Sequence, residues 1–282
     1  MPGLSAQPTS GLSARTTSGL FARPTSGLSA RPVSGLSEVR PGDDLAALTV
    51  AALEREGPRD GQVVAIAHKA VSKSEGAVVA LADVHPSARA IELAAAVPDG
   101  QQKDPRAVQV VLDESVELLR AERGVLVCRT RHGFVCANAG VDASNASPDG
   151  GGETLILLPR DPDASARRIR ARLRELTGAA GAVLITDSFG RAWRHGQLDV
   201  AVGLAGMQAL EDWRGQTDAT GLELRATWLA VADAAAAAAD LARAKDSREP
   251  AVIIDGLERF VTAADGPGAA ELLRALEEDL FR

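Results

Sequence analysis

Residues 181–197, GAVLITDSFGRAWRHGQ, combine a short apolar run with side chains that can do chemistry. The apolar run, residues 182–185, has the length of a buried strand, and Asp187 and Ser188 follow it closely. A carboxylate and a hydroxyl at the end of a strand are hard oxygen ligands for a divalent cation. The alternative is a plain strand cap, because Asp and Ser favour turns by bonding to nearby backbone amides. The local pattern supports the two interpretations equally.

Two further groups in the sequence are suited to phosphate. Arg191 and Arg194 follow in the same segment and can bind a phosphate or a carboxylate, unless they are simply solvated. In residues 61–76, GQVVAIAHKAVSKSEG, a strand at residues 63–67 is expected to run into a loop rich in Lys and Ser, whose donors suit phosphate oxygens. The spacing of a Walker loop is missing, and taken alone a solvated basic turn is favoured.

The loop at residues 138–145, NAGVDASN, follows a hairpin expected from strands at residues 125–128 and 134–137. Asp142 offers a carboxylate to a metal, and Asn145 offers an amide to a nucleotide or a phosphate. An Asx-rich turn is the alternative. Cys128 and Cys136 flank the hairpin turn, and we expect them to be reduced core residues.

The composition excludes several classes of function. The 282 residues are 45% hydrophobic and 24% charged, with a net charge of -7, which is typical of a soluble globular protein. The acidic total argues against nucleic acid as a partner, because binding a phosphate backbone needs a dense basic patch. No run of about 18 apolar residues is present, and the N-terminus does not resemble a secretory signal. We therefore expect a cytoplasmic protein without a membrane span.

A repeat opens the chain, with a Gly-Leu pair every eight residues at Gly3, Gly11, Gly19, Gly27 and Gly35. This stretch is rich in Ser, Thr, Pro and Gly, and it cannot bury enough apolar surface to offset the entropy of ordering it. We expect a disordered tail over residues 1–31 and one folded part over residues 32–282.

Capping residues and apolar periodicity predict the elements that must position these candidates. Asp43 or Asp44 should begin a helix that ends near Gly57, and Asp161 should begin another that ends at Gly178. Further helices are predicted at residues 86–96, 105–121, 225–244 and 268–281, and further strands at residues 154–158 and 251–254.

Five segments follow one another along the chain: KAVSKSEG, RHGFVCANAGVDASN, LLPRDPDASA, ITDSFGRAWRHGQ and WLAVADAAAAAADL. Each is weak alone, but together they resemble the coenzyme F420-0:gamma-glutamyl ligase family, from about residue 33 to about residue 257. The resemblance implies a two-lobed α+β fold, homodimers, and a GTP-dependent ligase that adds L-glutamate to the deazaflavin precursor coenzyme F420-0 and then gamma-links further glutamates. It also implies the use of Mg²⁺ or Mn²⁺, helped by K⁺.

The resemblance also assigns roles to residues. The metal site would be formed by Asp142, Asp187 and Ser188, where many members carry threonine in place of the serine. From the chemistry of such a reaction, we expect Lys73 to clamp a phosphate, and we take Arg191 or Arg194 as hypothetical holders of a substrate carboxylate or phosphate. GTP would be held by Ser34, Gly35, Leu36, Ser37, His68, Lys73 and Asn145. In the implied route, the γ-phosphoryl group of GTP moves to the F420-0 carboxylate, and the glutamate amine attacks the acyl phosphate.

The chain departs from the family pattern in two places. Repeat sequence, LSARPVSGL, fills the place of an apolar first strand, and this predicts a frayed strand. Lys245 lies where relatives often have a glycine-containing loop that sometimes supplies a metal ligand, and an ammonium group cannot ligate a metal. Two other functions stay open: a nucleotide-dependent phosphotransferase acting on another carboxylated metabolite, and a non-catalytic GTP-binding subunit.

Overall fold

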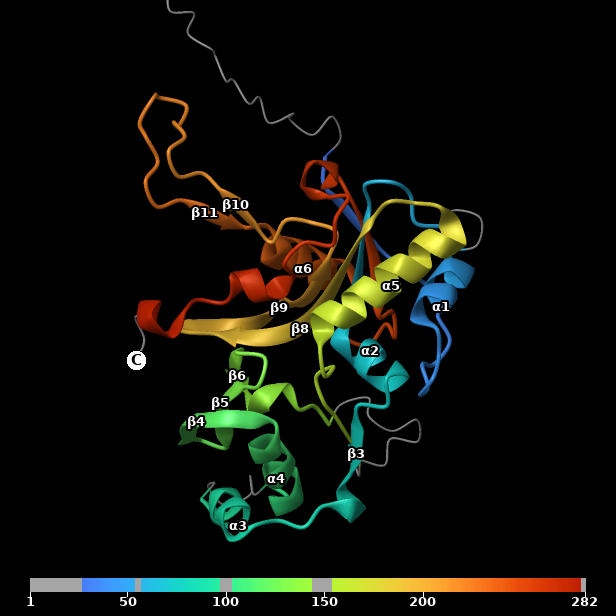
Figure 1. Cartoon of the computed structure of the whole chain (residues 1–282). Helices are drawn as coiled ribbons and strands as arrows, with labels where there is room; N and C mark the ends of the chain where they lie inside the picture. Colours follow the sequence, from blue (N-terminus) through green and yellow to red (C-terminus); the bar gives the residue numbers. More distant parts are fainter. Residues whose placement is uncertain (1–26, 54–56, 97–102, 144–153, 280–282) are drawn as a thin grey trace, which may run out of the picture.

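A five-stranded main sheet organises the molecule in the computed structural model, which describes residues 27–53, 57–96, 103–143 and 154–279 (Figure 1). The spatial order of the strands is β1-β12-β2-β8-β9, and only β2 and β8 are parallel neighbours. Their bounds are β1 Ser29–Pro32, β2 Val63–Ala67, β8 Ala182–Arg191, β9 Arg194–Ala205 and β12 Ala251–Asp255.

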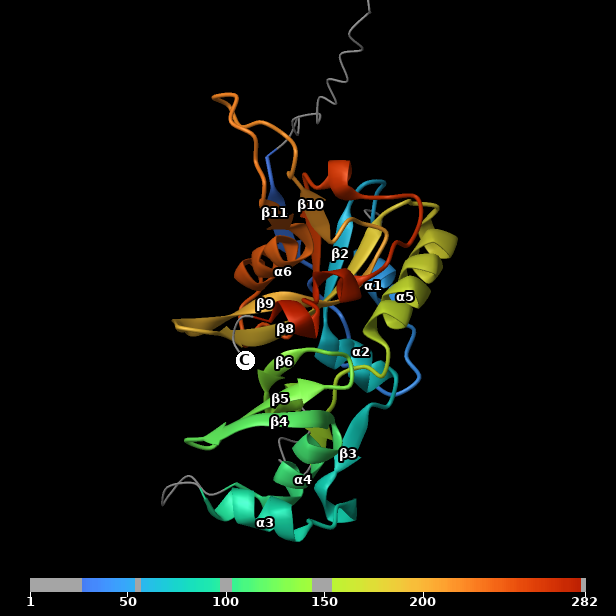
Figure 2. The same ribbon diagram turned by 60° about the vertical axis from the view of Figure 1, so that its left-hand side comes forward.

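Both faces of the main sheet are buried. Alternate residues of β2 face opposite cores, with Val64 and Ile66 in one and Val63 and Ala65 in the other. The first core is covered by helices α1 (Leu45–Ala52) and α5 (Pro162–Thr177), and the second by α6 (Val231–Ala242), on the other side of the sheet (Figure 2). Burial on both faces explains why these strands are continuous apolar runs in the sequence.

The caps predicted for α1 and α5 are confirmed. The carboxylate of Asp44 accepts a hydrogen bond from the backbone N–H of Ala47 at 3.0 Å. Asp161 caps α5 in the same way, and Gly178 ends that helix with a left-handed backbone, φ +75°. These caps fix where each helix begins or ends against the main sheet.

A three-stranded small sheet lies below the main sheet in Figure 1. It consists of β4 (Ser115–Glu122), β5 (Val125–Thr130) and β6 (Val135–Ala137), and helices α3 (Ala88–Ala95) and α4 (Pro105–Asp113) share a separate core with it. Cys128 and Cys136 are register partners across β5 and β6, and both are buried and form no disulfide. The prediction of reduced core cysteines is therefore confirmed.

Shorter elements complete the described chain. Strands β3 (Val78–Ala80) and β7 (Thr154–Ile156) pair with each other, as do β10 (Leu210–Asp212) and β11 (Trp228–Ala230). The segment between β10 and β11 projects away from the main sheet (Figure 1). Of the helices in the described ranges, none is long and apolar enough to cross a membrane.

Tertiary pairing overrides several local predictions. Residues 68–74, expected as a loop, form helix α2 (His68–Ser74), because Ala70 and Val71 are buried against the main core. The helix expected at 105–121 ends at Asp113, and the rest of that segment pairs with β5 as strand β4. The helix expected from residue 225 begins at Val231, because residues 228–230 pair with β10 as β11.

The C-terminal segment is also different from its prediction. Instead of a helix over 268–281, the described residues form two short 3₁₀ turns, Ala269–Leu272 and Leu276–Glu278. The consecutive residues Leu272 and Leu273 pack against different cores of the main sheet. Two successive residues of a helix point in similar directions and could not pack on opposite faces of the main sheet. The backbone is accordingly extended at Leu273.

The first strand corrects the expected boundary of the tail. Residues 29–31, placed in the tail by the sequence, belong to β1, which pairs with β12 at the edge of the main sheet. An edge strand tolerates Pro32, since proline has no N–H to donate to a neighbouring strand. Val33 follows β1 and is buried in the core. The prediction for residues 1–26 lies outside the described residues.

Candidate functional site

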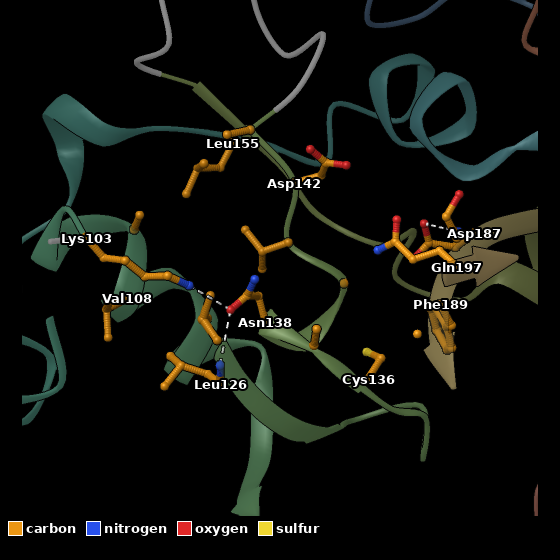
Figure 3. Close-up of a pocket in the computed structure, with 18 of the residues that line it drawn as sticks. Lys103, Val108, Leu126, Cys136, Asn138, Asp142, Leu155, Asp187, Phe189 and Gln197 are labelled. Atoms are coloured by element: carbon orange, nitrogen blue, oxygen red, sulfur yellow. Dashed lines mark hydrogen bonds between the residues drawn. The ribbon is translucent and has the colours of Figure 1, made fainter. Parts of the chain in front are cut away.

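A cleft of about 440 Å³ lies between the end of β8 and the small sheet with its helix α4 (Figure 3). Asp142, Asp187 and Ser188, the residues expected to bind a metal, all line this cleft. Asp142 comes from the loop after β6 and Asp187 from β8, so the fold brings together two carboxylates that are distant in the sequence. This convergence was expected from the family resemblance and not from local pattern.

Asp187 and Ser188 lie inside β8 and not in a turn after it. They pair with Val200 and Asp199 of β9, and the register shifts between Ile185 and Thr186. A register shift of this kind is a β-bulge, which changes the direction in which the following side chains point. The sequence predicted the end of the apolar run correctly but could not show that β9 extends the strand.

Asp142 is held by an unusual turn. Asn138, Ala139 and Gly140 all have a left-handed backbone, with φ of +51°, +52° and +72°. Asparagine tolerates this conformation, but for Ala139 it is costly and requires support from the surroundings. The side chain of Ala139 is buried, and the backbone of Asp142 exchanges two hydrogen bonds with Ile156 of β7, at 3.0 and 2.8 Å. The loop is therefore fixed on both sides.

Helix α2 supplies a basic partner to each carboxylate. Lys69 Nζ lies 2.7 Å from Asp142 Oδ2, and His68 Nε2 lies 3.2 Å from Asp187 Oδ1. The backbone N–H of Ser188 also donates to Asp187 Oδ1 at 2.8 Å. Both carboxylates are thus oriented by neighbours before any substrate binds.

His68 lies where a contact with the nucleotide was expected, but its side chain is only 2% exposed. The ring faces Asp187 at ion-pair distance without the alignment of a hydrogen bond, and both ring nitrogens are buried without a hydrogen-bond partner among the described residues. Buried polar atoms that lack partners are rare and often occur at functional sites. We interpret His68 as a residue that positions Asp187.

The donor set fits a divalent cation that is shared with a substrate. Mg²⁺ is usually held by one or two carboxylates together with substrate phosphates and water. In the part of the chain that the structure describes, no group of three or more His, Cys, Asp and Glu side chains could hold a metal alone. Asp142 and Asp187 could supply the protein ligands, and the cation would take the others from a triphosphate.

A buried carboxylate that sequence reasoning missed supports Ser188. Asp199 of β9 is 1% exposed and accepts hydrogen bonds from Thr186 Oγ1 and Ser188 Oγ, both at 2.7 Å. Arg243 forms an ion pair with the same carboxylate. The signal in the sequence is an aspartate between Leu198 and Val200, at the start of the apolar half of the strand, since a buried carboxylate there requires partners.

Lys245 contacts the proposed metal ligand directly. Its Nζ donates to Ser188 Oγ and to Asp240 Oδ1, each at 2.9 Å. The side chain is 69% exposed, so it can move away at little cost. If Ser188 is to ligate a metal, the ammonium group of Lys245 must leave the hydroxyl oxygen or share it.

The two segments expected to hold GTP lie side by side. Lys73 of α2 forms an ion pair with Glu38 at 2.6 Å, and the backbone N–H of Gly42 donates to the carbonyl of Ser74 at 2.8 Å. Ser34 donates its hydroxyl to Glu249, which extends the contact to the segment before β12. The structure therefore brings the loop that contains Ser34, Gly35, Leu36 and Ser37 against α2.

Two other predicted residues lie away from the cleft lining. Arg191 and Arg194 pair with each other at the end of the β8–β9 hairpin, and Arg191 Nη2 donates to the carbonyl of His195 at 2.8 Å. Neither lines the cleft, so their proposed contact with a substrate stays a prediction. Asn145 lies outside the described residues.

Burial in the cleft wall shifts the pKa values of two groups. Burial, aided by the negative charge of Asp187, raises the pKa of the Cys136 thiol to about 12. Burial also lowers the pKa of the Lys103 ammonium group. Sequence reasoning had not identified Lys103 as a residue of the site.

Comparison with known proteins gives a consistent result. A sequence model described as F420-0:Gamma-glutamyl ligase matches residues 35–256. The chain is 44% identical over 247 residues to the coenzyme F420:L-glutamate ligase of Methanopyrus kandleri, covering 87% of this chain and 94% of the relative. The protein of that name from Methanothermobacter thermautotrophicus is also 44% identical, covering 86% and 94%, respectively. The one from Halobacterium salinarum is 43% identical over 248 residues, covering 87% and 92%.

Proposed function

We propose, because the chain belongs to the F420-0:gamma-glutamyl ligase family, that it forms an amide bond between L-glutamate and coenzyme F420-0. The observation that carries the proposal is the convergence of Asp142 and Asp187 on one cleft, beside α2 and its lysines. A carboxylate cannot be joined to an amine without activation. A site that can hold a cation and phosphates next to an acceptor is suited to that activation.

The proposed reaction has two steps. A carboxylate oxygen of F420-0 attacks the γ-phosphorus of GTP, the bond from that phosphorus to the bridging oxygen breaks, and GDP leaves. The uncharged amine of glutamate then attacks the acyl phosphate carbon, inorganic phosphate leaves, and one proton is released. The first step develops charge on phosphoryl oxygens, which preorganised cations stabilise.

The described residues can serve these steps in distinct ways. A divalent cation held by Asp142, Asp187 and Ser188 would neutralise phosphate oxygens of the nucleotide. Lys73 would clamp a phosphate after exchanging its bond with Glu38, and Lys69 would do so after leaving Asp142. Arg191 and Arg194 would reach only those parts of a substrate that extend beyond the cleft.

Family membership supports further proposals of the same kind. These are GTP as the nucleotide, Mg²⁺ or Mn²⁺ with K⁺ as cations, gamma-linked addition of further glutamates, a cytoplasmic location and a homodimer. The separate cores of the main sheet and the small sheet support a two-lobed organisation. Light scattering coupled to gel filtration would test the homodimer, since a monomeric mass at micromolar concentration contradicts it.

The direct test is one incubation of the full-length protein with F420-0, GTP, Mn²⁺ and glutamate, followed by mass spectrometry. We expect products heavier than F420-0 by whole glutamyl units, together with GDP and phosphate. Omitting glutamate or Mn²⁺ gives the matched controls. A phosphorylated product without glutamate consumption would instead indicate a phosphotransferase, and GTP binding without phosphate release would indicate a non-catalytic subunit.

A further inference from the structure

Lys103 occupies the end of the cleft opposite to Asp187 (Figure 3). It lies two residues before α4 in the chain, and its Nζ donates to the side-chain oxygen of Asn138 at 3.0 Å. Asn138 begins the left-handed turn that leads to Asp142. The ammonium group therefore lies on the same cleft as the proposed metal ligands but is held by a different set of elements.

The charge of Lys103 has no acidic counterpart in the described ranges, although three carboxylates line the same cleft. Asp104 is engaged by Arg106, whose Nη2 lies 2.7 Å away and whose backbone N–H donates at 2.8 Å. Asp142 is paired with Lys69, and Asp187 faces His68. Burial lowers the pKa of Lys103, which agrees with an ammonium group that has lost water without gaining an anion.

The walls around this ammonium group are apolar. They are formed by side chains from α4, β5, the loop after β6, and β7, namely Ala107, Val108, Val111, Leu126, Val141 and Leu155. A partly buried cation among apolar walls is stabilised by an anion that brings apolar surface with it. A fully polar ligand would leave the walls uncovered, and a neutral one would leave the charge uncompensated.

We propose that the Lys103 end of the cleft binds an anionic group of the acceptor substrate, with the apolar walls packing against the ring system of the deazaflavin. This inference rests on the proposed function. Glutamate is a poorer candidate, since it has little apolar surface. The nucleotide is also a poorer candidate, because its phosphates would share the cation at the Asp187 end, and none of Ser34, Ser37 and Lys73 lines the cleft.

Three variants of Lys103 distinguish the effect of its charge from the effect of its hydrogen bond to Asn138. Lys103→Gln keeps a donor for Asn138 but removes the charge, Lys103→Met removes both, and Lys103→Arg keeps the charge. Arg89→Gln is the matched control, since Arg89 is exposed on α3 beside α4 and its loss removes one positive charge elsewhere. For each protein we would measure KM separately for F420-0, glutamate and GTP, the Kd of F420-0 by calorimetry without GTP, and the melting temperature.

The expected result is a rise of about tenfold or more in the KM and Kd for F420-0 in both the Gln and the Met variants, as for loss of a charge-assisted hydrogen bond. The Arg variant should recover most of this loss, and Arg89→Gln should match the wild type. The KM for GTP and glutamate should change by less than about twofold in all variants.

Several outcomes would overturn the inference. Wild-type affinity in Lys103→Gln would show that Lys103 only supports the turn at Asn138, and a rise in the KM for glutamate alone would assign the subsite to the amino acid. The Kd of F420-0, measured by calorimetry, distinguishes failure of the proposed subsite from failure of the proposed function. If wild-type protein binds F420-0 through Lys103 but makes no amide, the proposed function fails and the subsite stands. If it ligates while Lys103→Gln binds F420-0 normally, the subsite fails.

Discussion

The two ends of the cleft differ in how their charges are satisfied. At the β8 end, Asp142 and Asp187 lie against basic side chains of α2, and Asp199 behind them accepts three side-chain donors. At the Lys103 end, a cation has an amide oxygen and apolar walls but no acidic partner among the described residues. The difference indicates that the protein itself orients the charged side chains at the β8 end, whereas a ligand must supply the counter-charge at the Lys103 end.

Asp187→Asn should reduce ligase activity more than any other change at the β8 end. The amide has the same shape but no negative charge for a cation, so we expect ligation to fall by at least about 1000-fold, a barrier increase of about 4 kcal/mol. The measurement is kcat at saturating F420-0, glutamate, GTP and Mn²⁺. Asp161→Asn is the control, since asparagine caps a helix as well as aspartate does and Asp161 lies outside the cleft. Activity of Asp187→Asn within about threefold of wild type, near 0.7 kcal/mol, contradicts the metal role.

Asp199→Asn tests whether the buried ion pair between Asp199 and Arg243 stabilises the β8 end of the cleft. Removing one partner leaves Arg243 charged and only 11% exposed, so we expect the free energy of unfolding to fall by about 3–5 kcal/mol. Urea unfolding would measure this loss. Glu92→Gln is the control, because it breaks an exposed helix pair with Arg89 and should cost about 0.5 kcal/mol or less. Equal losses in the two variants would show that the Asp199 network does not hold the strand ends in place.

Lys245→Gln removes the ammonium group that donates to Ser188. One positive charge about 4 Å from a divalent cation costs roughly 2 kcal/mol in water, twice the value for two unit charges. We therefore expect the half-saturating Mn²⁺ concentration to fall, by up to about 30-fold. A titration of ligase activity with Mn²⁺ measures this, with the charge-retaining Lys245→Arg as control. A higher Mn²⁺ requirement in the Gln variant would mean that Lys245 assists metal binding.

The smallest expected effect concerns Cys136, which lines the cleft near Asp187. Its thiol titrates near pH 9 in the unfolded chain and at about 12 in the folded protein. Below pH 9 both states are protonated and stability is full; between these values the unfolded chain binds fewer protons, so stability falls as pH rises. From neutral pH to pH 10, the unfolding free energy of the wild type should fall by about 1.4 kcal/mol more than that of Cys136→Ala. Parallel pH profiles would show that the thiol is accessible to water.

The sequence predicted the features that depend on local chemistry. The caps at Asp44 and Asp161 are confirmed because capping requires only a short polar side chain before the first helical turn. The apolar run before Asp187 marked a buried strand for a similar reason. The predicted metal ligands Asp142, Asp187 and Ser188 line one cleft, although their role as metal ligands stays a prediction.

Features that depend on distant partners could not be predicted in this way. The burial of His68 follows from the contact of α2 with β8, and the strand at 115–122 exists because β5 lies beside it. Lys103 is one of four lysines in the sequence, and only the fold shows that its neighbours are apolar. Arg243 follows an alanine-rich helix, and nothing in that pattern indicates an ion pair with Asp199.

The parallel pairing of β2 with β8 has a consequence for how the protein folds. Ala67 is the register partner of Thr186. The next residues, His68 and Asp187, therefore become neighbours only after β2 and β8, which are distant in the sequence, have paired. Pairings between distant segments form slowly, because the entropy of closing a long loop must be overcome first. A chain in which β2 and β8 have not yet paired therefore lacks the assembled site. During refolding, ligase activity should return together with the final cooperative transition.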